Sequence, residues 1–370
     1  MSSISVNTIT DASGGATTSI NGFTPSVSNM AGRNRIINGD MRIDQRNAGA
    51  SITFDGSNKY VTDRFFGFSN VGTTTAQQST VAPAGFNNSL LVTQTTGGSV
   101  VSSSYIALQH RVEGFNTADL GWGTASAQTV TLSFWVRSSI TGAFSVALNN
   151  SASNRSYVSN YTINAANTWE QKTITVTGDT SGTWLTNNGL GISLVWNFGY
   201  GSNYTTSTLN SWLGSGAFGS TTATTAFATT SGATWQITGV QLEAGSVATP
   251  FEHRQYGQEL ALCQRYYQTT YSGVAVGTPA TTLNQLNGWA LVTSTNWTQL
   301  VTFTCAMRTQ PTVTIYNPNS GATGSARING TVDAATAATA PTTLNTVVYS
   351  SASITAGHNV NYHYTSSAEL

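Results

Sequence analysis

Among the residues of this 370-residue sequence that could do acid–base chemistry are two pairs of carboxylates that lie close together in the chain. Asp40 with Asp44 and Glu243 with Glu252 are the pairs that a fold could bring face to face. Two carboxyl groups on either side of a glycosidic bond are what glycan hydrolysis requires. Neither spacing demands such a pair, and Asp63 beside Arg64 is explained more simply as a buried ion pair. The sequence therefore predicts no catalytic residue.

The sequence also lacks the motifs of nucleophilic catalysis and of metal binding. No Gly-x-Ser-x-Gly elbow or phosphate-binding glycine loop occurs. Cys263 and Cys305 each lie in an apolar pattern, which is typical of small buried residues and not of a disulfide. The histidines lack metal-ligand spacing to cysteine or acidic residues: His110, His253, His358 and His363. We expect no metal site and no cofactor. We predict that His363 lies on a strand surface, with a position near the axis of a three-copy assembly as the alternative.

Sugar binding requires less, because aromatic rings stack on pyranose rings while amide and guanidinium groups bind the hydroxyls. The long segment Asn197–Ser220 is rich in Gly, Ser and Thr and carries Tyr200, Tyr204 and Trp212. Trp122, between two glycines, is a second candidate for an exposed aromatic residue. Long loops with aromatic residues either bind a ligand or fold back onto a core. These four residues are candidates for glycan binding, and packing remains the alternative.

The composition excludes several classes of protein. Charged residues make up 8% of the chain, and 14 basic residues balance 14 acidic ones. Such a chain offers no electrostatic surface for nucleic acid or for an acidic membrane. No run of about 18 apolar residues predicts a membrane span. The first residues lack the regions of a signal peptide, so we expect synthesis in the cytoplasm without membrane insertion.

Alternation of apolar and polar residues with period two dominates the chain from about residue 36. In the segment 129–138 one face carries apolar residues alone: Val130, Leu132, Phe134 and Val136. The pattern returns in 144–148, 174–176 and 192–198, and turn-forming clusters separate these segments. Many short strands with one apolar face predict an all-β fold, an antiparallel sandwich or jelly roll. Near Gly239 the alternation changes phase, which predicts a β-bulge.

The segment Glu252–Gln268 is the convincing helix prediction. Its apolar seam has spacings of 4, 3 and 4 residues and consists of Tyr256, Leu260, Cys263 and Tyr267. Two heptads are too short to sustain a coiled coil alone. Two explanations remain open for this seam. The four residues could form an oligomer interface around a symmetry axis, or the helix could dock on its own sandwich.

The length suits two or three domains. Residues 1–35 hold too little apolar material to bury themselves, so we predict an attachment arm there, with a flexible tail as the alternative. A jelly-roll β-sandwich is predicted over 36–250 and a connecting helix over 251–270. The segment 271–370 is predicted to be a smaller C-terminal β-domain, in which the Ala- and Thr-rich stretch Asp333–Thr343 is expected to be a loop.

A set of segments follows in a fixed order through residues 34–268: NRIINGDM (34–41), VTDRF (61–65), LSFWVRS (132–138), GVQLEAG (239–245) with TPFE (249–252), and LCQRYY (262–267). Together they resemble a family of bacteriophage virion proteins, the tail-fibre-like or appendage proteins common in marine phages. The central part of that family is similar to jelly-roll carbohydrate-binding modules of the galactose-binding-like type. The resemblance covers about two thirds of the chain.

In those modules the opening motif Asn-Gly-x-Phe-Glu often helps to hold a structural calcium ion through its Glu. The stretch Asn38-Gly39-Asp40-Met41 resembles this opening, but the residue at the position of the Glu is Arg42. A guanidinium is a cation where a hard metal needs an oxygen ligand. This departure argues against calcium.

The resemblance implies a structural virion protein without enzymatic activity, a fibre or appendage subunit. It implies a homotrimer that joins other virion proteins through the arm 1–35 and that contacts a glycan on the host surface. A capsid decoration or cement protein would need the same arm, sandwich and symmetry, so that alternative stays open. A glycan depolymerase, the third hypothesis, would need one of the carboxylate pairs.

Overall fold

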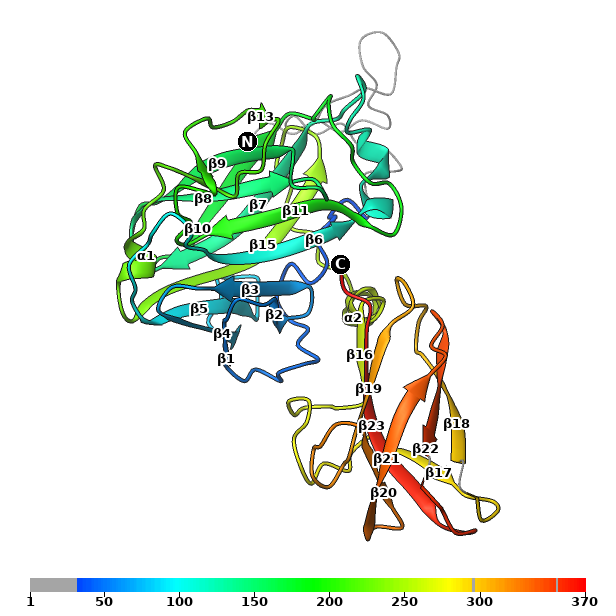
Figure 1. Ribbon diagram of the computed structural model, residues 1–370. Coiled ribbons are helices and arrows are strands. Elements are labelled where there is room, and N and C mark those ends of the chain that lie inside the picture. Colours follow the sequence, from blue (N-terminus) through cyan, green and yellow to red (C-terminus); the bar gives the residue numbers. More distant parts are fainter. Residues whose placement is uncertain (1–31, 295–296, 351) are drawn as a thin grey trace, which may run out of the picture.

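The computed structural model describes residues 32–294, 297–350 and 352–370, so nearly all of the arm predicted over 1–35 lies outside the described residues. The chain is an all-β protein, as predicted. A β-sandwich occupies the upper left of Figure 1, a smaller assembly of strands lies at the lower right, and the short helix α2 (Tyr256–Gln264) lies between them. No helix in the described part of the chain is long and apolar enough to cross a membrane.

Two antiparallel sheets form the sandwich. The first has the order β1 (Ile52–Thr53), β4 (Thr73–Ser79), β5 (Ser89–Thr96), β15 (Ala233–Ala244), β7 (Val130–Ser138) and β10 (Glu170–Val176). The second has the order β13 (Trp212–Leu213), β9 (Ser156–Ile163), β8 (Gly142–Asn149), β11 (Leu190–Asn197), β6 (Ile106–Glu113), β3 (Phe65–Ser69) and β2 (Lys59–Thr62). The chain crosses repeatedly from one sheet to the other, which is the connectivity of a jelly roll.

Short elements complete the sandwich. A parallel pair of two-residue strands, β12 (Thr205–Thr206) and β14 (Gly219–Ser220), lies within the long segment that follows β11. The helical elements of this part are single turns: η1 (Gly114–Asn116), η2 (Ala118–Leu120) and α1 (Ala226–Thr229).

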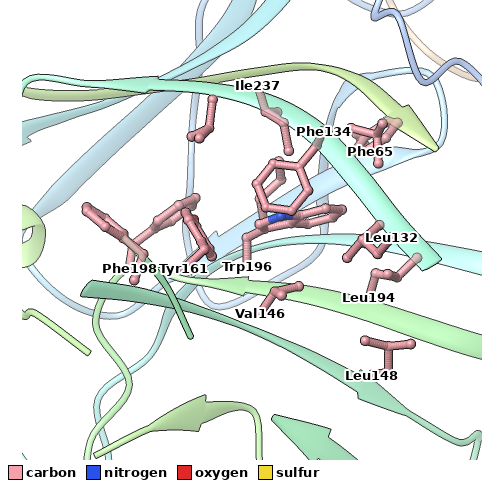
Figure 2. Packing of buried hydrophobic residues seen from close by; sticks show 14 of the residues in the cluster. Phe65, Leu132, Phe134, Val146, Leu148, Tyr161, Leu194, Trp196, Phe198 and Ile237 are labelled. Atoms are coloured by element: carbon pink, nitrogen blue, oxygen red, sulfur yellow. The ribbon is translucent and has the colours of Figure 1, made fainter. Parts of the chain in front are cut away.

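The core between the two sheets follows the predicted alternation. The apolar face predicted for 129–138 is fully buried in β7, and Leu194 and Trp196 of β11 meet it from the opposite sheet. Figure 2 shows Trp196 beneath Phe134, and the two ring centroids are 5.9 Å apart in an edge-to-face arrangement. Because side chains alternate along a strand, the same strands present a second set of side chains on the outer face.

The predicted bulge at Gly239 is confirmed. The register of β15 against β7 shifts between Thr238 and Gln241, and Gly239 has a φ of 61°. A Cβ atom at this position would lie 2.6 Å from the ring of Phe86. Both the backbone conformation and the close ring explain why glycine stands here.

A smaller antiparallel assembly follows the helix. Its main path is β16 (Tyr267–Thr269), β23 (Asn359–Ser367), β20 (Ser325–Ile328), β21 (Val332–Thr339), β22 (Asn345–Ser350) and β18 (Trp297–Thr302), with β17 (Leu286–Trp289) and β19 (Thr312–Tyr316) also paired to β23. It has a hydrophobic cluster of its own. The loop predicted over Asp333–Thr343 is wrong for its first half, because Ala334 and Thr336 pack inward and β21 pairs with both neighbours.

The helix prediction needs two corrections. Helix α2 begins at Tyr256 and ends at Gln264, and Tyr267 belongs to strand β16. The chain leaves the helix because the backbone of Tyr267–Thr269 pairs with β23. Between the helix and this strand, the Arg265 guanidinium and the Tyr266 hydroxyl both bind the buried carboxylate of Glu113, at 2.6 and 2.5 Å. A spacing of 4, 3 and 4 residues cannot reveal such long-range partners.

Charged residues join the sandwich to the smaller assembly. Glu369, which follows β23, pairs with Arg64 of the sandwich and with Arg46, whose Nη2 lies 2.8 Å from its carboxylate. Asp63 and Arg64 are buried, but the ion pair predicted between them is wrong, since Asp63 faces Arg46 at 3.5 Å. Burial raises the pKa of Asp63 to about 6. The domain boundaries predicted at 35, 250 and 270 stay a proposal.

Candidate functional site

The outer face of the seven-stranded sheet carries small side chains at its centre. The cross-strand row Gln109, Val195, Ala147 and Val158 runs over β6, β11, β8 and β9 in register. Its three apolar members are buried, although they point away from the main core. The long segment after β11 covers them. Small residues in this row leave room for large side chains of that covering segment.

Aromatic side chains from four parts of the chain gather over this face. Tyr200 and Phe218 stack with their ring centroids 5.8 Å apart, and Tyr200 meets Tyr204 edge to face at 5.7 Å. Tyr105 meets Phe68 of β3 edge to face at 5.7 Å. Burial raises the pKa of Tyr200, so its hydroxyl stays protonated.

These rings border an open hollow of about 360 Å³. The volume lies within the range of about 300–1,000 Å³ that is typical of small-molecule sites. Polar side chains also line it: Asn58, Gln109, Arg111 and Ser153. The hollow thus combines aromatic surfaces with amide, guanidinium and hydroxyl groups.

Two of the four predicted glycan-binding residues, Tyr200 and Tyr204, line this hollow. The remaining lining residues were missed by the sequence analysis, because Phe68, Tyr105 and Arg111 lie far from the long segment in sequence. The alternation of side chains along β6 could have indicated which residues face this hollow. Gln109 and Arg111 share one strand face, while Leu108 and Val112 point into the core.

Trp122 and Trp212 lie elsewhere, in a cluster with Trp184. The ring centroids of Trp122 and Trp184 are 4.7 Å apart, and Trp212 lies 5.3 Å from each of them. The expectation that Trp122 is exposed is wrong, because only 7% of it is accessible. Its indole N–H donates to the Gln128 carbonyl, and that of Trp212 donates to the Thr177 carbonyl. The rings pack against one another and their N–H groups already have hydrogen-bond partners. Trp122 and Trp212 are therefore packing residues and do not line the hollow.

The predicted seam residues do not share one environment. Cys263 is fully buried, in a small cluster with Ile37, Ile43 and Tyr266 of the same chain. Leu260 packs against the edge of that cluster, whereas Tyr256 is 58% exposed. The buried part of the helix therefore docks on its own chain, which was one of the two explanations. Neither cysteine is in a disulfide.

Three of the four carboxylates considered for catalysis accept structural hydrogen bonds, whereas Asp40 forms an ion pair with Arg42. Glu243 accepts from the backbone N–H and the hydroxyl of Thr249, and Glu252 accepts from the backbone N–H groups of Gly32 and Asn34. Asp44 accepts from two backbone N–H groups of its own loop. Each of these carboxylates therefore stabilises a turn or a chain crossing.

The site suggested by the calcium-binding motif does not fit that metal. The Nε atom of Arg42 lies 3.1 Å from the carboxylate of Asp40, so a cation of the protein already occupies this position. No group of three or more His, Cys, Asp and Glu side chains in the described ranges could hold a metal ion.

Segments that carry the family resemblance meet at one crossing. The side-chain NH2 group of Asn34 donates to the Val240 carbonyl, while its side-chain oxygen accepts from the Leu242 backbone N–H. The Asn38 side chain donates to the carbonyls of Ile43 and Asp63. These motif residues hold strands and loops together, and they line no part of the hollow.

Two histidines are buried. His363 was expected on a strand surface, which is wrong: it is buried, its Nε2 lies 2.9 Å from the Thr281 carbonyl, and its ring stacks on Tyr271. His110 is buried against the ring of Phe65. Burial, and then the charge of Arg64, holds the pKa of His110 well below its ordinary value.

Lowering the pH below about 6.5 is expected to destabilise the protein through His110. Its unfolded form binds a proton there, whereas the folded form does so only at lower pH, so this contribution is complete above pH 6.5 and is lost as the pH falls. Each pH unit costs up to about 1.4 kcal/mol. Urea unfolding of wild type and His110→Gln between pH 7.5 and 5 measures the difference. If the difference in free energy of unfolding between the two proteins were the same at all pH values, His110 would not be the group responsible.

No protein-family model and no curated protein matches the chain. Similar solved structures include the enzymatically active domain of bacteriophage CBA120 tailspike protein 4, at 12% identity and a TM-score of 0.31 over 57% of this chain and 21% of that one. The family 11 carbohydrate-binding module of a Clostridium thermocellum cellulase has 11% identity and a TM-score of 0.27 over 56% and 99%. The module TmCBM61, in complex with β-1,4-galactotriose, has 10% identity and a TM-score of 0.26 over 57% and 99%. Likenesses of this degree carry no inference about function.

Proposed function

We propose that this chain is a non-enzymatic glycan-binding subunit of a bacteriophage fibre or appendage. The hollow on the outer face of the seven-stranded sheet is the observation that carries the binding part. Its aromatic rings offer stacking surfaces, while Asn58, Gln109 and Arg111 offer hydrogen-bond donors for hydroxyl groups. Such a combination suits a pyranose ring, which has apolar C–H faces and a polar edge.

The virion part of the proposal rests on the ordered sequence segments that resemble phage appendage proteins. In this proposal residues 1–35 join the chain to other virion proteins, and three copies assemble around an axis. Several hollows on one particle would then bind a glycan-covered surface with an avidity well above that of a single site. A capsid cement protein has no need of a sugar-sized hollow, so the site favours attachment over lattice stabilisation.

Glycan binding is expected to weaken at least about tenfold in Tyr204→Ala, which corresponds to about 1.4 kcal/mol, because this variant removes one aromatic wall of the hollow. Screening wild type on a glycan array, followed by titration calorimetry with the best ligand, measures the change. Tyr349→Ala is the matched control, since Tyr349 is a partly exposed tyrosine on β22, in the smaller assembly.

Absence of binding to any glycan, or equal affinity of wild type and Tyr204→Ala, would overturn the proposed site. Its virion part has a separate test. Antibody labelling of particles in electron micrographs is expected to mark a few positions on the tail, whereas uniform labelling of the capsid would support the cement alternative. Light scattering of the purified chain gives the number of copies in the assembly.

A further inference from the structure

Arg111 is the one charged side chain among the residues that line the hollow. It lies on the outer face of β6, two residues after Gln109, and it faces Ser193 of β11 across the sheet. The ring of Phe66 lies 4.8 Å from its guanidinium carbon. The position is therefore fixed by a strand and by an aromatic neighbour, as a preformed binding group requires.

The guanidinium of Arg111 is poorly satisfied by the protein. An arginine has five N–H donors, and within the described ranges this one makes a single hydrogen bond, from Nη1 to the main-chain oxygen of Leu370, the last residue described. Its Nε–H group is buried without a partner. No acidic side chain of the described residues forms a salt bridge with it.

Other arginines without a carboxylate partner are better satisfied. Arg137 donates to the Asn167 carbonyl and to the Gln236 amide oxygen, and Arg308 donates to three backbone carbonyls. Arg111 thus differs from them both in its unused donors and in facing an open hollow.

The surroundings of Arg111 also disfavour its positive charge. Partial burial is the main reason that the pKa of its guanidinium is lowered. The nearby charge of Arg64 acts in the same direction, whereas Tyr60 and Glu369 act against it. Arginine nevertheless stays charged in proteins. A bound anion would compensate this charge and would accept hydrogen bonds from the guanidinium N–H groups that face the hollow.

We propose that the hollow selects glycans whose pyranose ring bears a carboxylate, that is, uronic-acid sugars. This inference rests on the proposed function of the same hollow. A carboxylate matches the planar fork of a guanidinium and accepts two parallel hydrogen bonds. The aromatic walls take the apolar faces of the ring, and Gln109 and Asn58 bind its hydroxyl groups.

The test uses oligosaccharide pairs that differ in the C6 group alone: glucuronate and glucose, galacturonate and galactose, mannuronate and mannose. Calorimetry on the full chain is expected to show at least tenfold tighter binding of the uronate in one pair or more. That preference should shrink as salt is raised, because exposed charges are screened. It should fall below about threefold in Arg111→Gln, while Arg111→Lys retains part of it.

Arg308→Gln is the matched control. Arg308 holds the last residues of the chain, as Arg111 does, but it does not line the hollow. An equal loss of preference in both variants would show an indirect effect and would overturn the role of Arg111.

Equal binding of both sugars in every pair would overturn the acidic preference and leave the proposed function intact. The same holds for binding of neutral glycans alone. No binding to any glycan would overturn both proposals. The comparison of the paired sugars on wild type needs no variant, so a folding defect in Arg111→Gln does not affect it.

Discussion

Replacing Glu369 with alanine is expected to lower the free energy of unfolding by about 3–5 kcal/mol, because the change leaves a buried cation without its partner. The Arg64 side chain is almost fully buried, and its guanidinium lies over the ring of Tyr266, 3.6 Å from the centroid. Glu369 is its acidic partner. Arg46 loses the same partner but keeps Asp63. The cost therefore falls mainly on Arg64.

Urea unfolding followed by tryptophan fluorescence measures this effect. Since Glu369 ties the smaller assembly to the sandwich, a separate early transition is expected as that contact is lost. Asp333→Ala is the control, because it breaks the exposed ion pair with Arg327 and should cost about 0–1 kcal/mol. Equal losses in the two variants would show that the Glu369 contacts do not stabilise the junction.

The second large effect is expected in the core of the sandwich, where Trp196→Ala should cost about 3–5 kcal/mol. Trp196 is fully buried in β11, and its ring contacts those of Phe134 and Phe65 from both sheets. Alanine would leave a cavity between the sheets that rigid strands cannot close. Chemical denaturation of purified protein measures the loss.

A conservative change at the same position separates the effect of lost side-chain volume from the effect of the buried polar N–H group. The indole N–H of Trp196 is buried without a hydrogen-bond partner in the described part of the chain. Trp196→Phe removes that group and keeps most of the ring, so it should cost less than half as much as alanine. Trp289→Ala, at a residue that is 62% exposed, should leave stability nearly unchanged. A loss at Trp289 as large as that at Trp196 would contradict this description of the core.

The fold class and the inward faces of the main strands of the sandwich could be predicted from the sequence, because strand periodicity is a local property. A residue two positions along a strand points to the same side wherever the strand lies. For this reason the apolar face of β7 and the phase change at Gly239 were both predicted correctly. The same local pattern holds no information on which partner covers the outer face.

The candidate site depended on the tertiary structure. Tyr204 and Trp212 belong to one long segment and look alike as loop aromatics, yet one lines the hollow and the other packs on Trp122. Arg111 becomes a candidate only because the fold sets it beside Tyr200 in the lining of one hollow. Tyr267 lies outside the predicted helix because its backbone pairs with β23, about a hundred residues further along the chain. In the sandwich, the sequence by itself determined which side chains of the main strands face inward, since strand geometry repeats locally. The tertiary structure decided which outward side chains meet, since that depends on contacts between distant strands.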